Sequence, residues 1–318
     1  MALFLTEDDV CELLPMERAL ERVEASFLAQ AKGQGINRSR KRILLPHTSL
    51  HYMAAALPAE DWIGMKIYTV SRSEIRFVVL LFDAENGELK AVIQADQLGR
   101  IRTGAASGVA TKYLARENAS RVGLIGTGRQ ARTQLEAVAK VRQLSRVKVY
   151  GRDATRQREF CREMQTRCGL PVEPAASAEE AARFGEVVIT VTAAREPVVS
   201  GAWLRPGTHL NAVGANMANR RELDESALAR AGLIAVDSLE QASEEAGDLI
   251  QGFAKLGRGW EGVMELAAVV SGSGPRRNSQ DEITIFKSTG LALWDVAVAS
   301  YVYQQALQMG KGREVSFW

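Results

Sequence analysis

The chain has 318 residues, 46% of them hydrophobic and 25% charged, with 40 lysines and arginines against 38 aspartates and glutamates. This length suits two domains, because a single hydrophobic core stops growing at about 250 to 300 residues. The formal charge of +2 is no signature of a nucleic-acid partner, and no apolar run approaches the ~18 residues of a membrane span. We therefore expect neither a nucleic acid nor a membrane as a partner.

The cysteines and the N-terminal residues indicate the compartment. Cys11, Cys161 and Cys168 form an odd set without CxxC spacing, which indicates buried thiols and neither a disulfide framework nor a zinc site. The opening segment MALFLTEDDV lacks the basic region of a secretory signal. The sequence therefore predicts a cytoplasmic protein.

The first hundred or so residues mix helical and extended patterns. Thr6 precedes three acids, as at a helix start, and residues 16–31 have helical apolar spacing. Short extended runs follow between residues 43 and 98, and the ENG sequence within the turn at 83–88 is a hairpin signal. A helix rich in small residues is then predicted from residue 98, ending near Asn118.

From residue 122 onward, strands and helices alternate. Predicted helices cover residues 129–141 and a segment ending at Cys168, and the predicted strands are continuous apolar runs at 122–126, 147–151, 186–192, 209–214 and 233–238. Uninterrupted apolar strands are typical of a parallel sheet covered by helices on both faces. The sequence therefore predicts an α/β fold with a doubly wound Rossmann domain.

The C-terminal stretch reads as one strand, ITIFK, followed by a long helix. It lies too far along the chain to extend the nucleotide-binding half, so we expect it to cross back and pack on the first hundred residues. The first domain is then discontinuous, comprising residues 1–116 and 286–318, while residues 117–285 form the Rossmann domain.

The segment VGLIGTGRQA at residues 122–131 is a candidate dinucleotide cradle. A predicted strand runs directly into Gly126, and a helix without proline begins at about Arg129. Gly126 would permit the tight turn, Gly128 would let backbone approach a pyrophosphate, and Ala131 would keep the helix close to the sheet. The residues assigned to the cofactor from this segment are Gly126, Thr127, Gly128, Arg129, Gln130 and Ala131.

The end of the second Rossmann strand bears on the choice of nucleotide. NAD enzymes usually place an acid there to bind the ribose 2′-hydroxyl, but here Arg152 comes first and Asp153 second. A guanidinium can pair with a 2′-phosphate, so NADP is favoured, while Asp153 keeps NAD open. Thr103, Thr192 and Val213 are further expected cofactor contacts.

Three basic residues stand in apolar or small-residue surroundings: Arg42 in RILLP, Lys66 in GMKIYTV and Arg102 in LGRIRTGAAS. A buried lysine is costly unless it has a partner or a function. The alternative is a surface salt bridge for each, most of all for Arg42, whose neighbours Arg38, Arg40 and Lys41 form an ordinary charge run.

With these residues the chain resembles the ornithine cyclodeaminase and mu-crystallin family along almost its whole length. The motifs that carry the resemblance occur in this order: RILLP, GMKIYTV, VLLFDAENGE, LGRIRTGAAS, VGLIGTGRQA, NAVGANMANRRELD and FKSTGLALWDVAVA. The resemblance implies a homodimer, a discontinuous α+β domain for substrate binding and dimerisation, and a Rossmann domain that holds NAD or NADP.

The resemblance also implies roles for individual residues. Arg42 and Arg102 look like the pair that clamps the α-carboxylate of an amino-acid or imino-acid substrate, and Lys66 looks like the group beside the reacting nitrogen or carboxylate. Asp295 resembles a family position near the cleft, although a first-turn acid favoured by the helix dipole is an equal alternative. The substrate head group is then expected to meet the nicotinamide between the two domains.

Asn216 departs from the cyclodeaminase pattern, in which an aspartate at this place is suited to act as general base. An amide cannot take the proton, so the prediction shifts to a reductase that converts a ketimine, such as a Δ1-pyrroline-2-carboxylate, or an imine of an α-keto acid to an α-amino acid. Lys66 would donate the proton, and Asn216 would shape the pocket. Ornithine cyclodeaminase and an NADPH-dependent binding protein remain as alternatives.

His47 and His51 form an HxxxH pattern that on a helix could hold zinc. Their flanks look extended, no third ligand is near in sequence, and the Glu of HExxH is absent. We therefore predict no metal site, and either histidine could line the substrate cleft.

Overall fold

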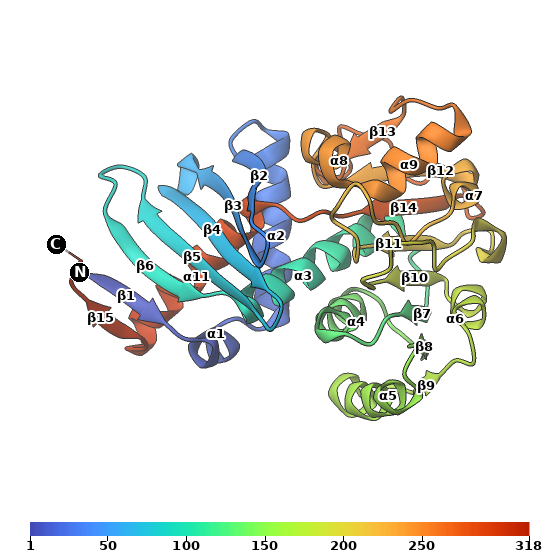
Figure 1. The fold of residues 1–318 in the computed structure, drawn as a ribbon, viewed down its shortest axis with the longest axis horizontal. Coiled ribbons are helices and arrows are strands. Elements are labelled where there is room, and N and C mark those ends of the chain that lie inside the picture. The colour runs from blue at the N-terminus through green and yellow to red at the C-terminus, as the bar shows by residue number, and fades with distance from the viewer. Residues whose placement is uncertain (318) are drawn as a thin grey trace. The chain divides into compact units, whose positions relative to one another are not determined.

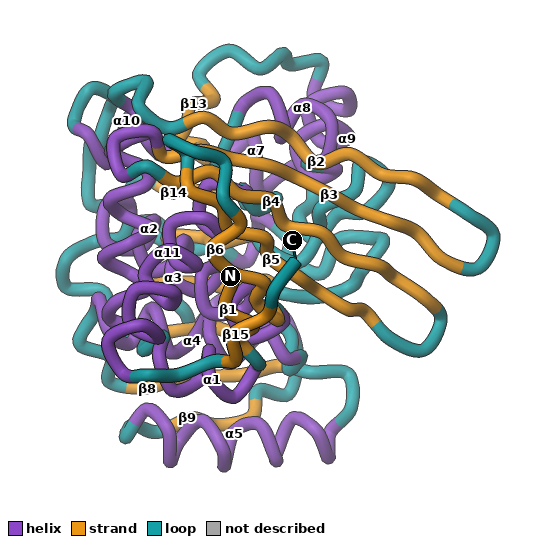
Figure 2. The backbone as a smooth tube through the Cα atoms, turned by 90° about the vertical axis from the view of Figure 1, so that its left-hand side faces the viewer, coloured by secondary structure: helices purple, strands orange, loops and turns teal. Residues whose placement is uncertain are grey.

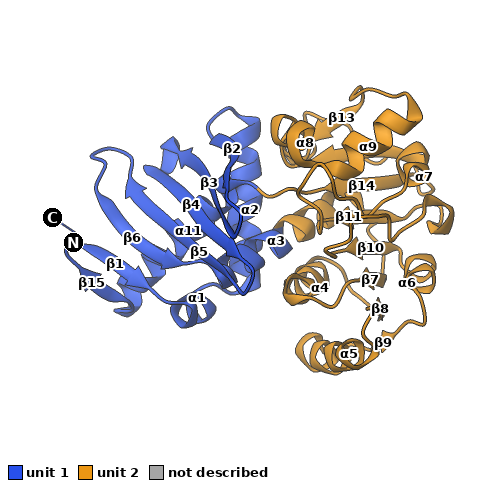
Figure 3. Ribbon diagram, viewed as in Figure 1, with its two compact units in different colours: residues 1–105, 291–318 blue, residues 106–290 orange. Residues whose placement is uncertain are grey.

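In the computed structural model, which describes residues 1–317, the chain forms two β-sheets, each with its own helices (Figure 1). The residues divide into two compact units (Figure 3). Unit 1 comprises Met1–Ala105 and the segment from Leu291 onward, and unit 2 comprises Ala106–Gly290. The boundary after Ala105 lies within a helix, and the boundary before Leu291 lies just before another helix. The sequence analysis placed the two boundaries at 116/117 and 285/286.

The sheet of unit 1 has seven strands in the order β15-β1-β6-β5-β4-β3-β2. They are β1 (Ala2–Leu5), β2 (Ile36–Leu44), β3 (Thr48–Leu57), β4 (Trp62–Ser71), β5 (Ile75–Asp83), β6 (Leu89–Gln94) and β15 (Arg313–Val315). The expected hairpin is present, since β5 and β6 pair antiparallel on either side of the ENG turn. Figure 2 shows the β2–β3 and β4–β5 hairpins as two long neighbouring arms.

One face of this sheet is covered by helix α11 (Ala292–Met309), which packs against β3, β4 and β5. Helix α2 (Met16–Ala31) lies against α11, where the rings of Phe27 and Trp294 meet edge to face at 5.3 Å. Helix α1 (Glu7–Leu13) begins at Thr6, whose side chain accepts from the backbone of Asp9 in a capping box. On α1 the prediction of buried cysteines fails, because Cys11 is exposed.

The predicted small-residue helix is present as α3 (Asp96–Leu114), which begins in unit 1 and continues into unit 2. The carboxylate of Glu7 accepts hydrogen bonds from the backbone N–H groups of Asp96 and Gln97 at 2.7 and 2.8 Å, so it caps the start of this helix. This cap fixes the start of α3, and with it the position of Arg102 in the second turn.

Unit 2 contains eight parallel strands in the order β13-β12-β14-β11-β10-β7-β8-β9, which confirms the doubly wound fold. The strands are β7 (Arg121–Ile125), β8 (Arg146–Tyr150), β9 (Val172–Pro174), β10 (Val187–Thr190), β11 (His209–Ala212), β12 (Ala231–Val236), β13 (Val263–Glu265) and β14 (Ile283–Lys287). The helices are α4 (Arg129–Val141), α5 (Ala154–Cys168), α6 (Ala178–Phe184), α7 (Glu225–Arg230), α8 (Leu239–Glu245), α9 (Gly247–Leu256) and α10 (Leu266–Ser271).

The expectation for the C-terminal stretch is half wrong. Helix α11 does return to unit 1, but strand β14 stays in unit 2, where it pairs with β11 and β12. All five residues of β14 are buried, and an apolar run of this kind needs neighbours on both sides. No helix within residues 1–317 is long and apolar enough to cross a membrane.

Candidate functional site

Lys66 lies in the middle of strand β4 with only 4% of its surface exposed. The alternation of the strand turns it to the face that α11 covers, with Met53 and Val79 as its neighbours in register. Its Nζ donates a hydrogen bond of 2.9 Å to Oδ1 of Asp295. Helix α3 lies close to this lysine, because a Cβ at Gly99 would stand 2.7 Å from Nζ and would displace the ammonium.

Arg102 donates from Nε to the same Asp295 oxygen, also at 2.9 Å, and its guanidinium lies over the Trp294 ring at 5.5 Å. Asp295 is fully buried in the first turn of α11, and its other oxygen, Oδ2, has no hydrogen-bond partner. Lys66 and Arg102 are thus not surface salt bridges. Oδ1 of Asp295 thus accepts hydrogen bonds from both cations, and Oδ2 accepts none.

A third cation, Arg40, is 4% exposed and close enough to affect Lys66 electrostatically. Burial lowers the pKa of Lys66 to about 8; Asp295 opposes this shift, while Arg102 and Arg40 add to it. We call Arg40, Lys66, Arg102 and Asp295 the cationic cluster. Lys66 and Arg102 are two buried cations that share the single carboxylate of Asp295, and the resulting excess of positive charge suits an anionic ligand.

Sequence reasoning assigned Arg40 to a solvated charge run and therefore missed it. Strand β2 changes register between Arg38 and Lys41, and this irregularity disturbs the simple alternation that the sequence suggests. Arg42, the residue that the sequence favoured, is half-buried and pairs in register with His51. It shares the face of Lys66, because His51 lies two residues from Met53 on β3.

His51 and His47 occupy different surroundings. His51 is buried on β3 and stacks on Tyr68 with ring centroids 4.5 Å apart, and burial together with Arg42 and Arg40 lowers its pKa to about 4. His47 is exposed in the turn before this strand. The flanks are extended, as predicted, and residues 1–317 place no group of three or more His, Cys, Asp and Glu side chains to hold a metal ion.

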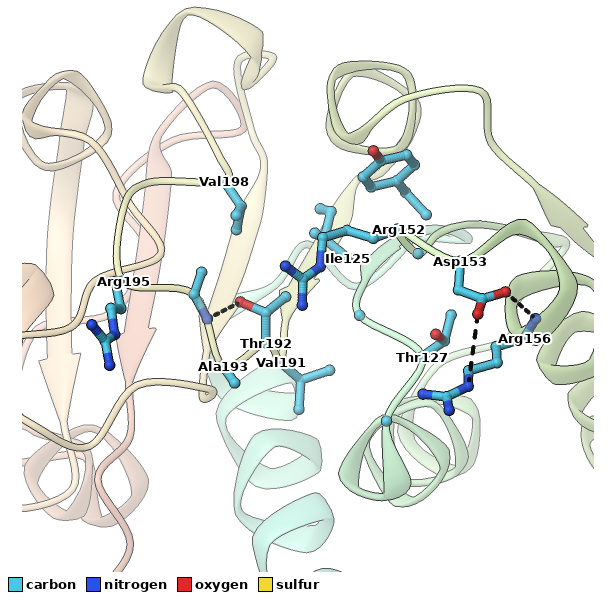
Figure 4. Close-up of a pocket in the computed structure, with 15 residues that line it drawn as sticks. Ile125, Thr127, Arg152, Asp153, Arg156, Val191, Thr192, Ala193, Arg195 and Val198 are labelled. Carbon is cyan, nitrogen blue, oxygen red and sulfur yellow. Dashed lines mark hydrogen bonds and ion pairs between the residues drawn. The ribbon is translucent and has the colours of Figure 1, made fainter. Parts of the chain in front are cut away.

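Unit 2 has a cleft of about 830 Å³ at the carboxyl ends of its strands (Figure 4). It opens around β7, where the strand order reverses, since β8 lies on one side and β10 on the other. In open parallel sheets this switch point is where dinucleotides bind. Five residues expected at the cofactor line the cleft: Gly126, Thr127, Gly128, Arg152 and Thr192.

The glycine loop has the geometry of a pyrophosphate site. Gly126 has a φ of 117°, and a Cβ there would lie 2.5 Å from the carbonyl oxygen of Val191. Gly128 is the N-cap of α4, no side chain caps that helix, and nothing stands within 4 Å of where its Cβ would be. The space and the N-terminal end of the helix dipole therefore fit a bound phosphate.

The β8 side of the cleft is cationic. Arg152 and Arg156 line it, and Figure 4 shows Arg152 reaching toward the middle of the cleft. Asp153 caps α5 by accepting from the N–H groups of Thr155 and Arg156 at 2.9 and 3.1 Å. These bonds lower the pKa of Asp153, and the bond from the N–H of Arg156 has the largest effect. Both bonds use Oδ1, and Oδ2 lies 3.8 Å from Nε of Arg156.

Comparisons with known proteins identify the family of this chain. The model of the ornithine cyclodeaminase/mu-crystallin family matches residues 1–310. The chain belongs to this family. It is 38% identical to a Δ1-pyrroline-2-carboxylate reductase of Bacillus cereus, over 87% of this chain and 88% of that protein.

Two solved structures of the family have almost the same fold. The Thermococcus litoralis Δ1-pyrroline-2-carboxylate reductase, in complex with NADH and L-proline, superposes with a TM-score of 0.94 at 34% identity and covers 98% of this chain and 100% of its own. An archaeal alanine dehydrogenase dimer with bound NAD has a TM-score of 0.94 at 36% identity, covering 100% of this chain and 99% of its own. These family members are NAD-linked amino-acid enzymes.

Five other residues that the sequence analysis assigned to the cofactor or to catalysis lie outside the cleft lining. Ala131 is fully buried in α4, as close packing of that helix requires, while Arg129 is exposed and Gln130 half-buried at its start. Val213 and Asn216 lie in the loop after β11, both half-buried. None of these five lines the cleft.

Thr103 belongs to unit 1, where its hydroxyl donates to the Gly99 carbonyl at 2.6 Å. The sequence missed two cleft arginines, Arg156 and Arg195. The position of Arg156, in the first turn of the helix that follows β8, was the available signal for Arg156.

Proposed function

We propose that this protein is an NAD(P)H-dependent imine reductase that converts an α-imino acid to an α-amino acid. The substrate class comprises cyclic ketimines, such as Δ1-pyrroline-2-carboxylate, and imines of α-keto acids. The observation that carries the proposal is the cationic cluster, in which Lys66, with a pKa of about 8, and the buried Arg102 share the single carboxylate of Asp295.

The residues of unit 1 have separate roles in this reaction. Arg102, assisted by Arg42, binds the substrate carboxylate and fixes the orientation of the imine carbon. Lys66 donates a proton to the imine nitrogen, and a pKa near the working pH suits this role. Asp295 holds the Lys66 ammonium in place through its 2.9 Å hydrogen bond. The nicotinamide cofactor, when bound, supplies the hydride.

Two features argue against ornithine cyclodeamination as the main activity. Asn216 stands where the cyclodeaminase pattern has an acid, and an amide cannot accept the proton of the attacking amine. In unit 1 the strand neighbour of Lys66 is Met53, 1% exposed, rather than a carboxylate that could pair with a second ammonium. A substrate side chain without charge fits these surroundings better than that of ornithine.

We propose NADPH as the preferred cofactor, with NADH as a second donor. Arg152 and Arg156 offer two guanidinium groups at the β8 side of the cleft, where a 2′-phosphate is expected, and the acid between them is engaged in capping α5. The relatives crystallised with NADH and NAD bind the related dinucleotide.

We further propose a cytoplasmic homodimer that uses the sheet of unit 1. On β4, Ile63, Met65 and Ile67 point away from the face that carries Lys66, and Ile63 is 44% exposed. Across the strands, Ile63 pairs with Ala56 and Phe82, so apolar residues continue along the sheet. A second copy could cover this face, and one related structure is a dimer.

The test is to mix purified protein with NADPH or NADH and Δ1-pyrroline-2-carboxylate, and to follow cofactor absorbance and proline formation. We expect oxidation of the cofactor with one proline per nucleotide. A parallel assay with L-ornithine and catalytic NAD measures ammonia. Ammonia and proline without net change of cofactor would instead identify a cyclodeaminase, and tight NADPH binding without turnover on any imine would identify a binding protein.

A further inference from the structure

Unit 2 contains a fully buried carboxylate that plays no part in the proposed chemistry. Glu222 lies in the segment between β11 and α7, and its two oxygens accept four hydrogen bonds. Oε1 accepts from the backbone N–H and the hydroxyl of Thr192 at 2.7 and 2.8 Å, and Oε2 accepts from Gly214 N–H at 2.7 Å and the Thr190 hydroxyl at 3.1 Å. One side chain thus joins the loops that follow β10 and β11.

Both loops belong to the part of the unit that would receive the cofactor. Thr192 and the next three residues, 193–195, form one wall of the cleft, and Thr192 Oγ1 also accepts from the N–H of Ala194. Gly214 leads to Asn216 in the neighbouring loop. The two loops touch at Gly214, where a Cβ would lie 2.3 Å from the backbone of Thr192 and 2.5 Å from Glu222. Glu222 therefore fixes the spacing of these loops.

A second layer holds Glu222 itself. Asp248, at the start of α9, accepts from the N–H groups of Glu222 and Leu223 at 2.5 and 2.8 Å. Lys287, at the end of β14, lies 2.8 Å from the other Asp248 oxygen and donates to the Ala215 carbonyl at 2.5 Å. We call Glu222, Asp248 and Lys287 the Glu222 network. All three are fully buried, and the third ties down the same loop after β11.

The strand order indicates which half of a bound dinucleotide would lie beside the Glu222 network. The pyrophosphate belongs at β7, and the arginines that favour the adenosine 2′-phosphate lie on the β8 side. The nicotinamide half then extends over the opposite side, toward the ends of β10 and β11. We propose that Glu222 is a positioning residue that shapes the nicotinamide half of the cofactor site by holding these two loops together, an inference that rests on the proposed function.

The amide variant Glu222→Gln tests this directly, because an amide nitrogen would have to face a backbone N–H or a hydroxyl now bonded to the carboxylate. We expect the Kd for NADPH, measured by fluorescence titration, to rise about tenfold to hundredfold. The Kd for ADP, which carries adenosine and pyrophosphate but no nicotinamide, should stay within twofold. A role limited to stability would move both constants together or neither.

Thr192→Val is the milder variant and covers the case in which Glu222→Gln fails to fold. It removes the hydroxyl between Glu222 and Ala194 but keeps the backbone bond, so we expect a smaller rise in the NADPH Kd, about threefold to tenfold, again without change for ADP. Asp224→Asn is the matched control, because this nearby carboxylate accepts from Ser200, Gly201 and Ala227 and lies outside the cleft lining.

The outcomes separate the inference from the proposed function. If the wild-type protein binds NADPH and neither variant changes the ratio of the NADPH and ADP constants, the inference is wrong and the proposed function stands. If Asp224→Asn changes that ratio equally, the inference is also wrong. If the wild-type protein binds neither NADPH nor NADH, the proposed function itself fails.

Discussion

The cationic cluster of unit 1 and the Glu222 network of unit 2 are both buried groups of opposite charges, but they are balanced differently. In unit 1 two cations, Lys66 and Arg102, share one oxygen of Asp295, and the other Asp295 oxygen has no hydrogen-bond partner. In unit 2 two carboxylates face one lysine, and every carboxylate oxygen has a hydrogen bond or an ion pair. A group left short of counter-charge is suited to receive a ligand, whereas a saturated one holds backbone in place.

The same contrast appears in the titration of the two groups. Burial lowers the pKa of Lys66, and its cationic neighbours lower it further. Burial raises the pKa of Glu222, while Lys287 and the bonds from Thr192 oppose the rise. The shift brings the pKa of Lys66 to about 8, as a proton donor requires.

The largest effect is expected from Lys66→Met, which removes the ammonium but fits the apolar neighbours on the sheet. We expect kcat for imine reduction to fall by about 10²–10⁴, because the proton donor is lost. The Kd for NADPH should remain unchanged. Steady-state kinetics and fluorescence titration measure the two, and a variant that retains a tenth of the wild-type kcat would show that Lys66 is not the donor.

In unit 2 the corresponding change, Lys287→Met, should act on stability. It leaves Asp248 buried without its cation, which costs about 3–5 kcal/mol of the free energy of unfolding. Urea denaturation measures the loss, and the double variant with Asp248→Asn should recover part of it. If Lys287→Met were as stable as the wild type, the saturated network would not have the structural role assigned to it.

A smaller effect is expected at the carboxylate clamp. Arg102→Gln removes one charge-assisted contact with the substrate, worth about 1.5–3 kcal/mol, so KM for the imine should rise about 10- to 150-fold. Arg42→Gln is the matched comparison, and its effect should be weaker because Arg42 is only half-buried. Equal effects of the two changes would contradict the greater role given to Arg102.

The smallest effects are opposite shifts of a pH profile. Lys66 donates its proton only while charged, so kcat/KM should decline as the pH rises through about 8. Asp295→Asn removes an anion that favours the ammonium, and should move this decline to lower pH. Arg40→Gln removes a repelling cation, and should move it to higher pH. Shifts in the same direction would mean that another group controls the profile.

Much of the fold could be predicted because its signals are local. The glycine loop, the parallel strands and the hairpin at residues 83–88 each depend on residues close together in the sequence. Strand β14 could not be placed in this way, since its position between β11 and β12 is decided by distant strands. An apolar run of five residues does not identify its sheet.

The site residues with a local signal could likewise be predicted from the sequence, and those that depend on distant residues could not. Lys66 and Arg102 stood out as charges in apolar surroundings, but Arg40 looked like part of a surface run until the irregularity of β2 brought it into the interior. Glu222 gave no signal in RRELD, because its four donors come from residues 8 to 32 positions away in the chain.

The order in which β14 and α11 leave the ribosome has a consequence for biogenesis. Strand β14 completes the sheet of unit 2, and α11, which comes next, brings Trp294 and Asp295 to strands of unit 1 that were synthesised long before. The unit that begins the chain is therefore the last to be completed. Until α11 has been synthesised, the strands of unit 1 have an uncovered apolar face and Lys66 lacks its carboxylate partner, so this unit needs protection from aggregation during that time.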